Sequence, residues 1–352
     1  MLCRSLLVLL AGLLLVQAHG VDLSLQKRQV AAKSYPPCGT SPPFDPAWST
    51  FLSGALDTGA DITACGNSKT WSLTYDDGPS EYTPGLLDQL DTVGVKTTFF
   101  VIGCNVANNP SILRRAYQAG HQIGIHTWTH PSLPKLTSEQ IVAEIMWTAK
   151  IIRDITGQTP TYMRPPYGDI DARVRGLLHK MGLKVVIWNR DTDDWELQTF
   201  NPNAQNSSQV VTPTSVRASI SSWIASPPAE GIISLEHDLF QLPAQIAGET
   251  LQRVSMAGFN INTVASCVGT APYNNTAIEV IFNPAIASSL SKAPSTTASA
   301  SANSTATLTA SKSPSSSPSP SAGSIRASLD WSIIGTIALV LLCSQLDVSN
   351  AF

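Results

Sequence analysis

The chain has few charged residues and no long hydrophobic run. Only 13% of its 352 residues are Asp, Glu, Lys or Arg, and the formal net charge is −3. Nucleic-acid-binding proteins need clustered basic residues, so this composition argues against that class and fits a neutral polymer ligand instead. The apolar runs near the two ends, at residues 6–16 and 331–343, are both shorter than the roughly twenty residues that a transmembrane helix requires.

The N-terminal run follows a basic residue and precedes small ones, which is the pattern of a secretory signal peptide over residues 1–18. Lys27-Arg28 then resembles a dibasic processing site. Two interpretations stay open for this pair. Either residues 19–28 are a propeptide, or the basic pair lies exposed in a linker.

Ser, Thr, Ala and Pro dominate residues 285–323, so this stretch cannot bury enough apolar surface to fold and should be a disordered stalk. Residues 324–352 hold a spacer and a short apolar tail. Together with the small residues before them they resemble a GPI-attachment signal, although a short single-pass anchor is the alternative. We therefore expect a secreted protein on the outer leaflet of the cell membrane or in the cell wall. The small residues at the attachment region are Ser321, Ala322 and Gly323.

The cysteine count agrees with secretion. An even number of cysteines in a secreted chain favours disulfides, and four cysteines allow two bonds in three pairings. Those between the leader and the tail are Cys38, Cys65, Cys104 and Cys267. Sequons for N-glycosylation begin at Asn206, Asn274 and Asn303.

Short β-branched or apolar runs alternate with helical patterns along the middle of the chain. We expect strands at residues 72–75, 97–102, 122–126, 162–164, 184–188, 231–235 and 260–264. Helices are expected near 83–93, 110–119, 138–155, 171–181, 213–224 and 245–256, the third of them capped by Ser138 and ended by Gly157. This alternation predicts an α/β fold, a distorted β/α barrel of about seven parallel strands in one catalytic domain. An open doubly wound sheet is the alternative.

Polar residues gather at the ends of the expected strands. One carboxylate of Asp76-Asp77, together with His126 and His130 spaced i, i+4, forms a ligand set for a divalent metal with an open position for water. The other carboxylate is then a candidate general base. Barrel enzymes assemble their active sites at the carboxyl ends of the strands. The sequence therefore predicts a metal-dependent hydrolase.

Five short motifs resemble, in the same order, those of the polysaccharide deacetylase family, the NodB-homology domain of carbohydrate esterase family four. They lie at residues 74–79, 126–130, 164–168, 191–195 and 235–238. Within the family, the chain is most similar to the fungal chitin deacetylases. The resemblance covers residues 65–270 and implies that residues 29–64 are an N-terminal extension that packs on the barrel.

The resemblance also implies roles for these residues. Asp76 would be the catalytic base, and Asp77, His126 and His130 would bind the metal, most plausibly Zn²⁺ with Co²⁺ as a substitute. His237 would be the general acid.

Further roles implied by the resemblance concern the surroundings of this centre. Arg164 would orient the base, the backbone N–H of Tyr167 would bind the oxyanion, and Asp191 would orient the histidine or the arginine. Trp195, Leu235 and Trp128 would line the substrate groove. The resemblance implies a Cys65–Cys267 disulfide, which leaves Cys38–Cys104 as the second bond.

The implied activity is hydrolysis of the N-acetyl groups of chitin, giving chitosan and acetate, by a monomer that binds chitin or its oligomers. Another acetylated polysaccharide, xylan or peptidoglycan, is the first alternative substrate. The second alternative is a non-catalytic protein that binds the cell wall. It is disfavoured because the expected base, ligands and acid are all present.

Overall fold

The computed structural model describes residues 35–54, 59–199 and 211–286. The expected leader and GPI signal, with residues 321–323, lie outside this part of the chain, as do the sequons at Asn206 and Asn303 and all of the expected stalk except residues 285–286. The remaining sequon residue, Asn274, is exposed. Within the described ranges, no helix combines the length and the apolar character needed to cross a bilayer.

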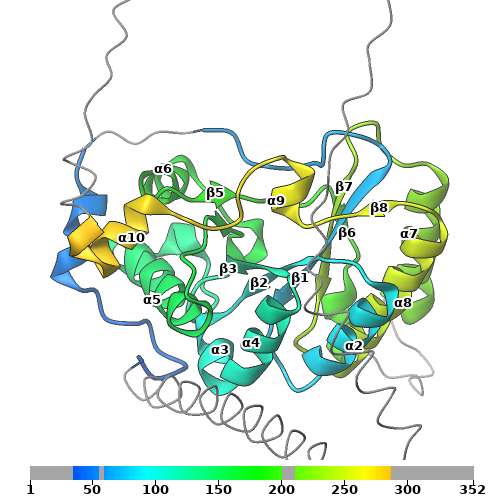
Figure 1. The fold of residues 1–352 in the computed structure, drawn as a ribbon, viewed down its shortest axis with the longest axis horizontal. Coiled ribbons are helices and arrows are strands. Elements are labelled where there is room, and N and C mark those ends of the chain that lie inside the picture. The colour runs from blue at the N-terminus through cyan, green and yellow to red at the C-terminus, as the bar shows by residue number, and fades with distance from the viewer. Residues whose placement is uncertain (1–34, 55–58, 200–210, 287–352) are drawn as a thin grey trace, which may run out of the picture. The chain divides into compact units, whose positions relative to one another are not determined.

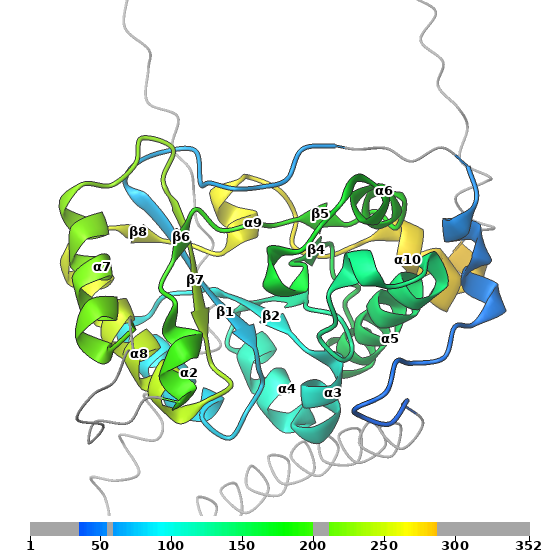
Figure 2. The same cartoon turned by 180° about the vertical axis from the view of Figure 1, so that it is seen from behind.

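A curled sheet of parallel strands forms the centre of the fold (Figures 1 and 2). The strand order is β5-β4-β3-β2-β1-β7-β6, and β8 pairs with the first residues of β1. In the described residues no pairing joins β5 to β6, so the sheet is a half-barrel rather than a closed barrel. The strands are β1 (Thr70–Asp77), β2 (Thr98–Val101), β3 (Gln122–Ile125), β4 (Tyr162–Met163), β5 (Lys184–Val185), β6 (Arg190–Asp191), β7 (Ile232–His237) and β8 (Asn260–Ile261).

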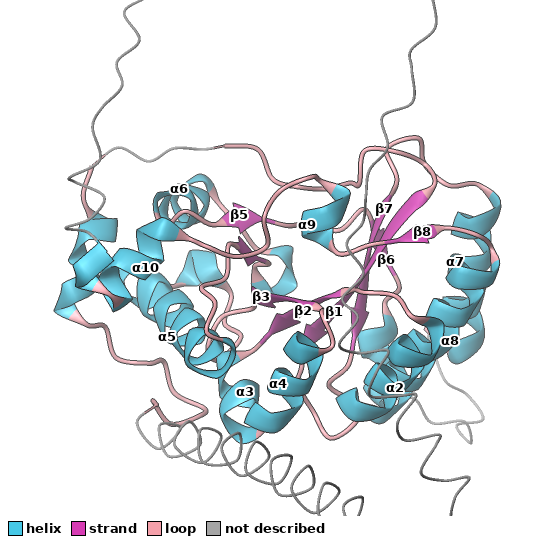
Figure 3. Ribbon diagram, in the orientation of Figure 1, coloured by secondary structure: helices cyan, strands magenta, loops and turns pink. Residues whose placement is uncertain are grey.

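The seven expected strands are all present, and the predicted β/α barrel class is confirmed. Two-residue β6 was not predicted, because two residues give no alternation to detect. Figure 3 shows helices to the left of the curled sheet, below it and to its right. Six of them match the predicted helices: α2 (Thr83–Val93), α4 (Pro110–Gln118), α5 (Ser138–Thr156), α6 (Ala172–Lys180), α7 (Pro213–Ala225) and α8 (Gln241–Met256). Three short ones were missed: α3 (Gly103–Asn108), α9 (Val264–Cys267) and α10 (Thr276–Phe282).

The ends of α5 show which local signals determine a helix. Its cap is Thr137, not the predicted Ser138: the Thr137 side chain accepts a hydrogen bond from the backbone N–H of Gln140, and the Gln140 side chain bonds back. Gly157 ends the helix as predicted. Its φ of 78° suits glycine, and its N–H donates to the carbonyl of Arg153.

The two faces of the sheet bury different residues. Trp71, Leu73 and Tyr75 of β1 belong to the large outer core, which the helices cover. A smaller inner cluster, which includes Phe100 and Ile233, fills the hollow of the half-barrel. Because side chains alternate along a strand, polar residues at the carboxyl ends of the strands lie above this inner cluster, at the mouth of the hollow.

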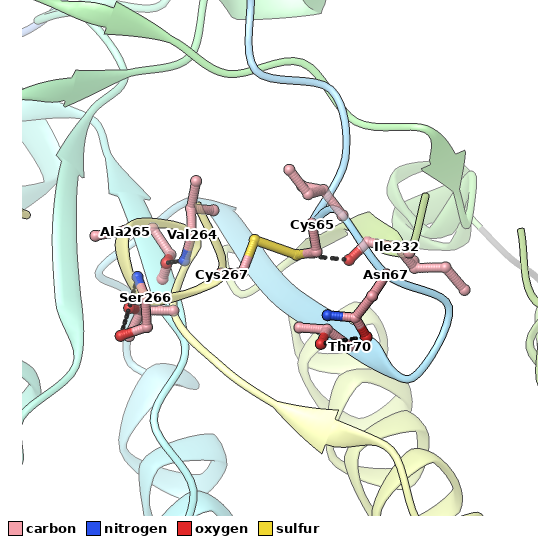
Figure 4. Close-up of a disulfide and its surroundings, with 12 residues drawn as sticks. Cys65, Asn67, Thr70, Ile232, Val264, Ala265, Ser266 and Cys267 are labelled. Atoms are coloured by element: carbon pink, nitrogen blue, oxygen red, sulfur yellow. Dashed lines mark hydrogen bonds between the residues drawn. A yellow bond between two sulfur atoms is a disulfide. The ribbon is translucent and has the colours of Figure 1, made fainter. Parts of the chain in front are cut away.

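Two disulfides tie remote parts of the chain together. Cys65, just before β1, is bonded to Cys267 at the end of α9, and the Cys65 sulfur also lies 3.4 Å from the carbonyl of Ile232 (Figure 4). The second bond joins Cys38 to Cys104 in α3. Both pairs are those that the family resemblance implies.

The N-terminal segment, residues 35–54, packs on α5 and on the loop after β3. Trp48 in the 3₁₀ helix Pro46–Leu52 is buried and meets Trp147 edge-on, with ring centroids 5.7 Å apart. Tyr35 stacks on Trp128 at 6.0 Å. Trp128 is 0% exposed, so it cannot line a groove. The prediction that Trp128 contacts substrate is wrong, because the N-terminal segment covers the ring.

Candidate metal centre and active site

Asp77, His126 and His130 converge at the mouth of the half-barrel. Oδ1 of Asp77 lies 3.5 Å from Nε2 of His126 and 3.4 Å from Nε2 of His130. Their ligand atoms all lie within 4.8 Å of one another, a suitable cluster for one cation. Asp77 is the last residue of β1, and the two histidines belong to the loop after β3. These are the three residues that the family resemblance implies as ligands.

The chemistry of this cluster fits a divalent cation. His126 Nδ1 lies 2.8 Å from the carbonyl of Arg164, so it carries the proton and leaves the Nε2 lone pair facing Asp77. Oδ1 of Asp77 is buried and has no hydrogen-bond partner among the described residues. Burial lowers the pKa of both His126 and His130 to about 4, so both rings are neutral at pH 7 and free to bind a metal. Two nitrogens and one carboxylate oxygen suit zinc.

The backbone of the Asp77 turn is held from two sides. Oδ1 of Asp238 accepts a hydrogen bond from the N–H of Gly78 at 3.0 Å, and Nδ2 of Asn105 donates to the carbonyl of Asp77 at 2.8 Å. Only glycine fits at position 78, since a Cβ there would lie 2.3 Å from Asp238. Sequence reasoning missed both supporting side chains because they come from other parts of the chain.

Asp76 lies beside the metal cluster and is 2% exposed. Nη1 of Arg164 lies 2.8 Å from Oδ1 of Asp76, and the same nitrogen donates to the hydroxyl of Thr74 at 2.6 Å. Burial raises the pKa of Asp76 to about 6, although the charge of Arg164 acts in the opposite direction. A carboxylate that is ionised at neutral pH and yet basic can accept a proton from water.

His237 ends β7, in register with Asp76 of β1. Its Nδ1 lies 2.7 Å from Oδ1 of Asp194, and its backbone N–H donates to Oδ2 of the same carboxylate at 2.8 Å. Burial lowers the pKa of His237, but the charge and hydrogen bond of Asp194 outweigh burial and raise it to about 10. The imidazolium can therefore donate a proton at neutral pH.

The side chain that holds His237 is thus Asp194; Asp191, expected to orient either the histidine or the arginine, does not bond to the histidine. Asp191 lines the same cavity, but its carboxylate accepts a hydrogen bond from the backbone N–H of Asp193. Both candidates were visible in the sequence as the two ends of Asp-Thr-Asp-Asp. The positive φ of Asp193, 55°, turns the chain between them.

These residues open into one cavity of about 520 Å³. Leu235 lies at its inner end and is 5% exposed, whereas Tyr167, Trp195 and Phe240 expose 67%, 46% and 37% of their surface. Sequence reasoning predicted Tyr167, Trp195 and Leu235 here but not Phe240. Exposed aromatic faces around a polar centre suit a ligand that is itself amphipathic, such as a sugar.

Unusual backbone conformations gather around the same cavity. Six non-glycine residues of the described chain have positive φ, and only Asn274 lies away from the site or its loops. Such conformations are costly and persist where neighbouring contacts enforce them, often at functional sites. The other five are Asp77, Thr127, His130, Tyr167 and Asp193.

Comparisons with known proteins agree with this geometry. The family model for polysaccharide deacetylase matches residues 63–186. The structure of the chitin deacetylase from the fungus Colletotrichum lindemuthianum superposes with a TM-score of 0.54 and 30% identity, over 62% of this chain and 97% of that chain. The chain belongs to the polysaccharide deacetylase family.

Curated relatives within the family include chitin deacetylases. Chitin deacetylase 1 of Cryptococcus neoformans var. grubii is 41% identical over 228 residues, 61% of this chain and 47% of that protein. Chitin deacetylase of Amylomyces rouxii is 37% identical over 223 residues, 62% of this chain and 50% of that protein. The chain thus spans about half the length of these two relatives. The family match includes the candidate metal ligands and ends before Asp194 and His237.

Proposed function

We propose that this protein is a metal-dependent deacetylase that hydrolyses the N-acetyl groups of chitin, giving chitosan and acetate. The observation that carries the proposal is the convergence of three sets of groups in one cavity. They are the metal-ligand cluster, a buried carboxylate paired with Arg164, and a histidine paired with Asp194. The names of the two fungal relatives above support chitin as the substrate.

A divalent cation held by Asp77, His126 and His130, zinc with cobalt as a substitute, would polarise the acetyl carbonyl and make a water more acidic. Asp76 accepts a proton from the attacking water, while the Arg164 guanidinium keeps the carboxylate oriented. The protein residues that act on the substrate come from separate strand ends and loops, which the half-barrel brings together.

Two further groups act on the developing charges. The backbone N–H of Tyr167 donates to the oxyanion that replaces the carbonyl oxygen. His237 donates its proton to the departing amine nitrogen, and Asp194 stabilises the imidazolium before that transfer. The C–N bond breaks as the amine leaves, and acetate and a glucosamine unit are the products. Leu235 and Trp195 would hold the acetyl methyl and the sugar face.

Peptidoglycan is the second candidate substrate. The peptidoglycan-N-acetylglucosamine deacetylase PgdA of Listeria monocytogenes is 34% identical over 203 residues, although the chain spans only 39% of that protein. The same groups would act on either polymer, because the reacting group is an N-acetyl group in both. Contacts beyond the reacting sugar would then decide between the polymers.

Acetate release tests the proposed activity. We would incubate the protein with chitin oligomers, acetylated xylan and peptidoglycan, each with and without a chelator, and then add zinc or cobalt back. The proposal requires release from chitin oligomers, loss with the chelator and recovery with metal. Asp76→Asn with zinc retained should lower turnover by about 10² to 10⁴. Full activity in excess chelator, or of Asp76→Asn, would contradict the mechanism.

We also propose that the chain is exported and held at the cell surface by a GPI anchor. The two disulfides agree with an oxidising environment outside the cell. Treating intact cells with a phosphatidylinositol-specific phospholipase should release the protein. Retention on membranes after treatment would favour the short single-pass anchor instead.

A further inference from the structure

Glu144 is a buried carboxylate without a positively charged partner. It lies in the first half of α5 and is 0% exposed. Among the described residues no ion pair involves it, although burial of an unpaired carboxylate is costly. Burial raises the pKa of Glu144, and only hydrogen bonds act in the opposite direction. A carboxylate that is buried without a counter-charge needs hydrogen bonds to its oxygens.

The carboxylate of Glu144 accepts three hydrogen bonds, and all of them come from the loop between the candidate ligands His126 and His130. Oε2 of Glu144 accepts the backbone N–H of Trp128 at 2.7 Å and that of Thr129 at 2.8 Å. Its Oε1 accepts the hydroxyl of Thr129 at 2.7 Å. The carboxylate therefore holds the middle of a five-residue loop whose two ends carry the imidazoles.

The other contacts of this loop act on different atoms. The carbonyls of Thr127 and Trp128 accept the backbone N–H groups of Gly103 and Cys104 at 2.9 and 3.1 Å. The hydroxyl of Thr127 accepts the N–H of His130 at 3.0 Å. These bonds leave the N–H groups of residues 128 and 129 to Glu144. Without it, the buried N–H of Trp128 and the partly buried N–H of Thr129 would lack partners, and the loop would rearrange to satisfy them.

The conformation that Glu144 supports is not one the loop would adopt freely. Thr127 and His130 have φ values of 65° and 62°, in the left-handed region that side chains disfavour. That shape is what directs both Nε2 atoms toward Asp77. We propose that Glu144 is a positioning residue for the metal site, whose carboxylate holds the 126–130 loop so that His126 and His130 are preorganised to bind a cation. This inference rests on the proposed metal-dependent function.

Two conservative substitutions separate geometry from charge. Glu144→Asp keeps the negative charge but withdraws the carboxylate by one methylene. Glu144→Gln removes the charge but keeps the reach: its amide oxygen can accept both N–H groups, and its amide nitrogen can donate to the hydroxyl of Thr129. If position matters, Glu144→Asp should weaken zinc binding about 10- to 100-fold, the usual effect of losing a group that supports a metal ligand. Glu144→Gln should weaken it by less than that.

Zinc affinity would be measured by competition with a chromophoric chelator, and the visible absorption of the cobalt-loaded protein would report the geometry of the ligands. Glu279→Gln is the matched control. Glu279 lies in α10 and pairs with Arg153 in the last turn of α5, without a contact to the loop. It should leave zinc affinity and the cobalt spectrum unchanged. Thermal unfolding of each metal-free variant would confirm that it is folded.

The outcomes separate the two proposals. A wild-type protein that fails to bind zinc would sink the metal-dependent function, and the role of Glu144 with it. If the wild type binds zinc and Glu144→Asp binds it as tightly with the same cobalt spectrum, only the role of Glu144 is overturned. Weakening in Glu144→Gln but not in Glu144→Asp would assign the effect to charge and also overturn positioning.

Discussion

Replacing Asp194 with asparagine tests the proposed general acid. The carboxylate of Asp194 lies 2.7 Å from Nδ1 of His237 and is 0% exposed, so solvent and salt screen the interaction poorly. Although burial lowers the pKa of His237, the charge and hydrogen bond of Asp194 raise it to about 10. Asparagine keeps the shape of the side chain and removes the charge.

The size of the effect follows from Coulomb's law. Two unit charges about 4 Å apart interact by about 4 kcal/mol at an effective dielectric constant of about 20. Since one pKa unit corresponds to about 1.4 kcal/mol, losing the charge should lower the pKa of His237 by about 3 units. An acid must be protonated to act, so activity is lost as the pH rises through this pKa. In a plot of activity against pH, the loss of activity on the alkaline side should therefore move to lower pH by about 3 units.

The assay is kcat/KM for acetate release as a function of pH, with the wild type and Asp194→Asn both loaded with zinc. A cation also lowers the pKa of His237, but it does so in both proteins, and the comparison isolates the effect of Asp194. Asp193→Asn is the control, because Asp193 is exposed, whereas the carboxylate that bonds His237 belongs to Asp194. An unchanged alkaline limb in a zinc-loaded Asp194→Asn variant would refute the assignment of His237 as the acid.

Three further predictions concern stability and substrate binding. Serine at both Cys65 and Cys267 should lower the free energy of unfolding by up to about 5 kcal/mol, because the bond spans 202 residues; an unchanged denaturation midpoint would count against this. Trp128→Ala should lower the free energy of unfolding by about 3–5 kcal/mol and leave KM for chitin oligomers unchanged. A raised KM in a variant that stays folded would show that this ring contacts the substrate. Trp195→Ala should raise KM for long oligomers about tenfold, since an aromatic contact contributes roughly 1.5 kcal/mol, and an unaltered KM would exclude it from binding.

The residues that follow directly from strands could be predicted from the sequence. Asp77 comes from the end of β1, and His126 and His130 share one short loop after β3, so parallel pairing alone brings them to one edge. One carboxylate and two imidazoles at that edge then indicate a site for a divalent metal. The same reasoning placed His237 at this edge, and the structure shows it next to Asp76, because β7 pairs with β1 in register.

Residues whose positions depend on contacts between remote segments could not be predicted. Trp128 is flanked by the two histidines, and nothing local shows that Tyr35 covers it. Glu144 looks like an ordinary polar residue of an amphipathic helix, and only the folded loop reveals what its oxygens bind. Whether Asp191 or Asp194 bonds to His237 depends on the left-handed backbone conformation of Asp193 between them. No glycine in this motif indicates that conformation in the sequence.

Residues 35–54 cover the rings of Trp128 and Trp147, and this contact bears on how the protein should be produced. The family match begins at residue 63, a natural place to trim a recombinant chain. Such a chain would lack Tyr35, Cys38 and Trp48, leaving a free thiol at Cys104 and an uncovered apolar face on Trp128 within the loop that carries both histidines. We expect chains truncated at residue 63 to aggregate during purification, so residues 35–54 should be kept in the recombinant protein.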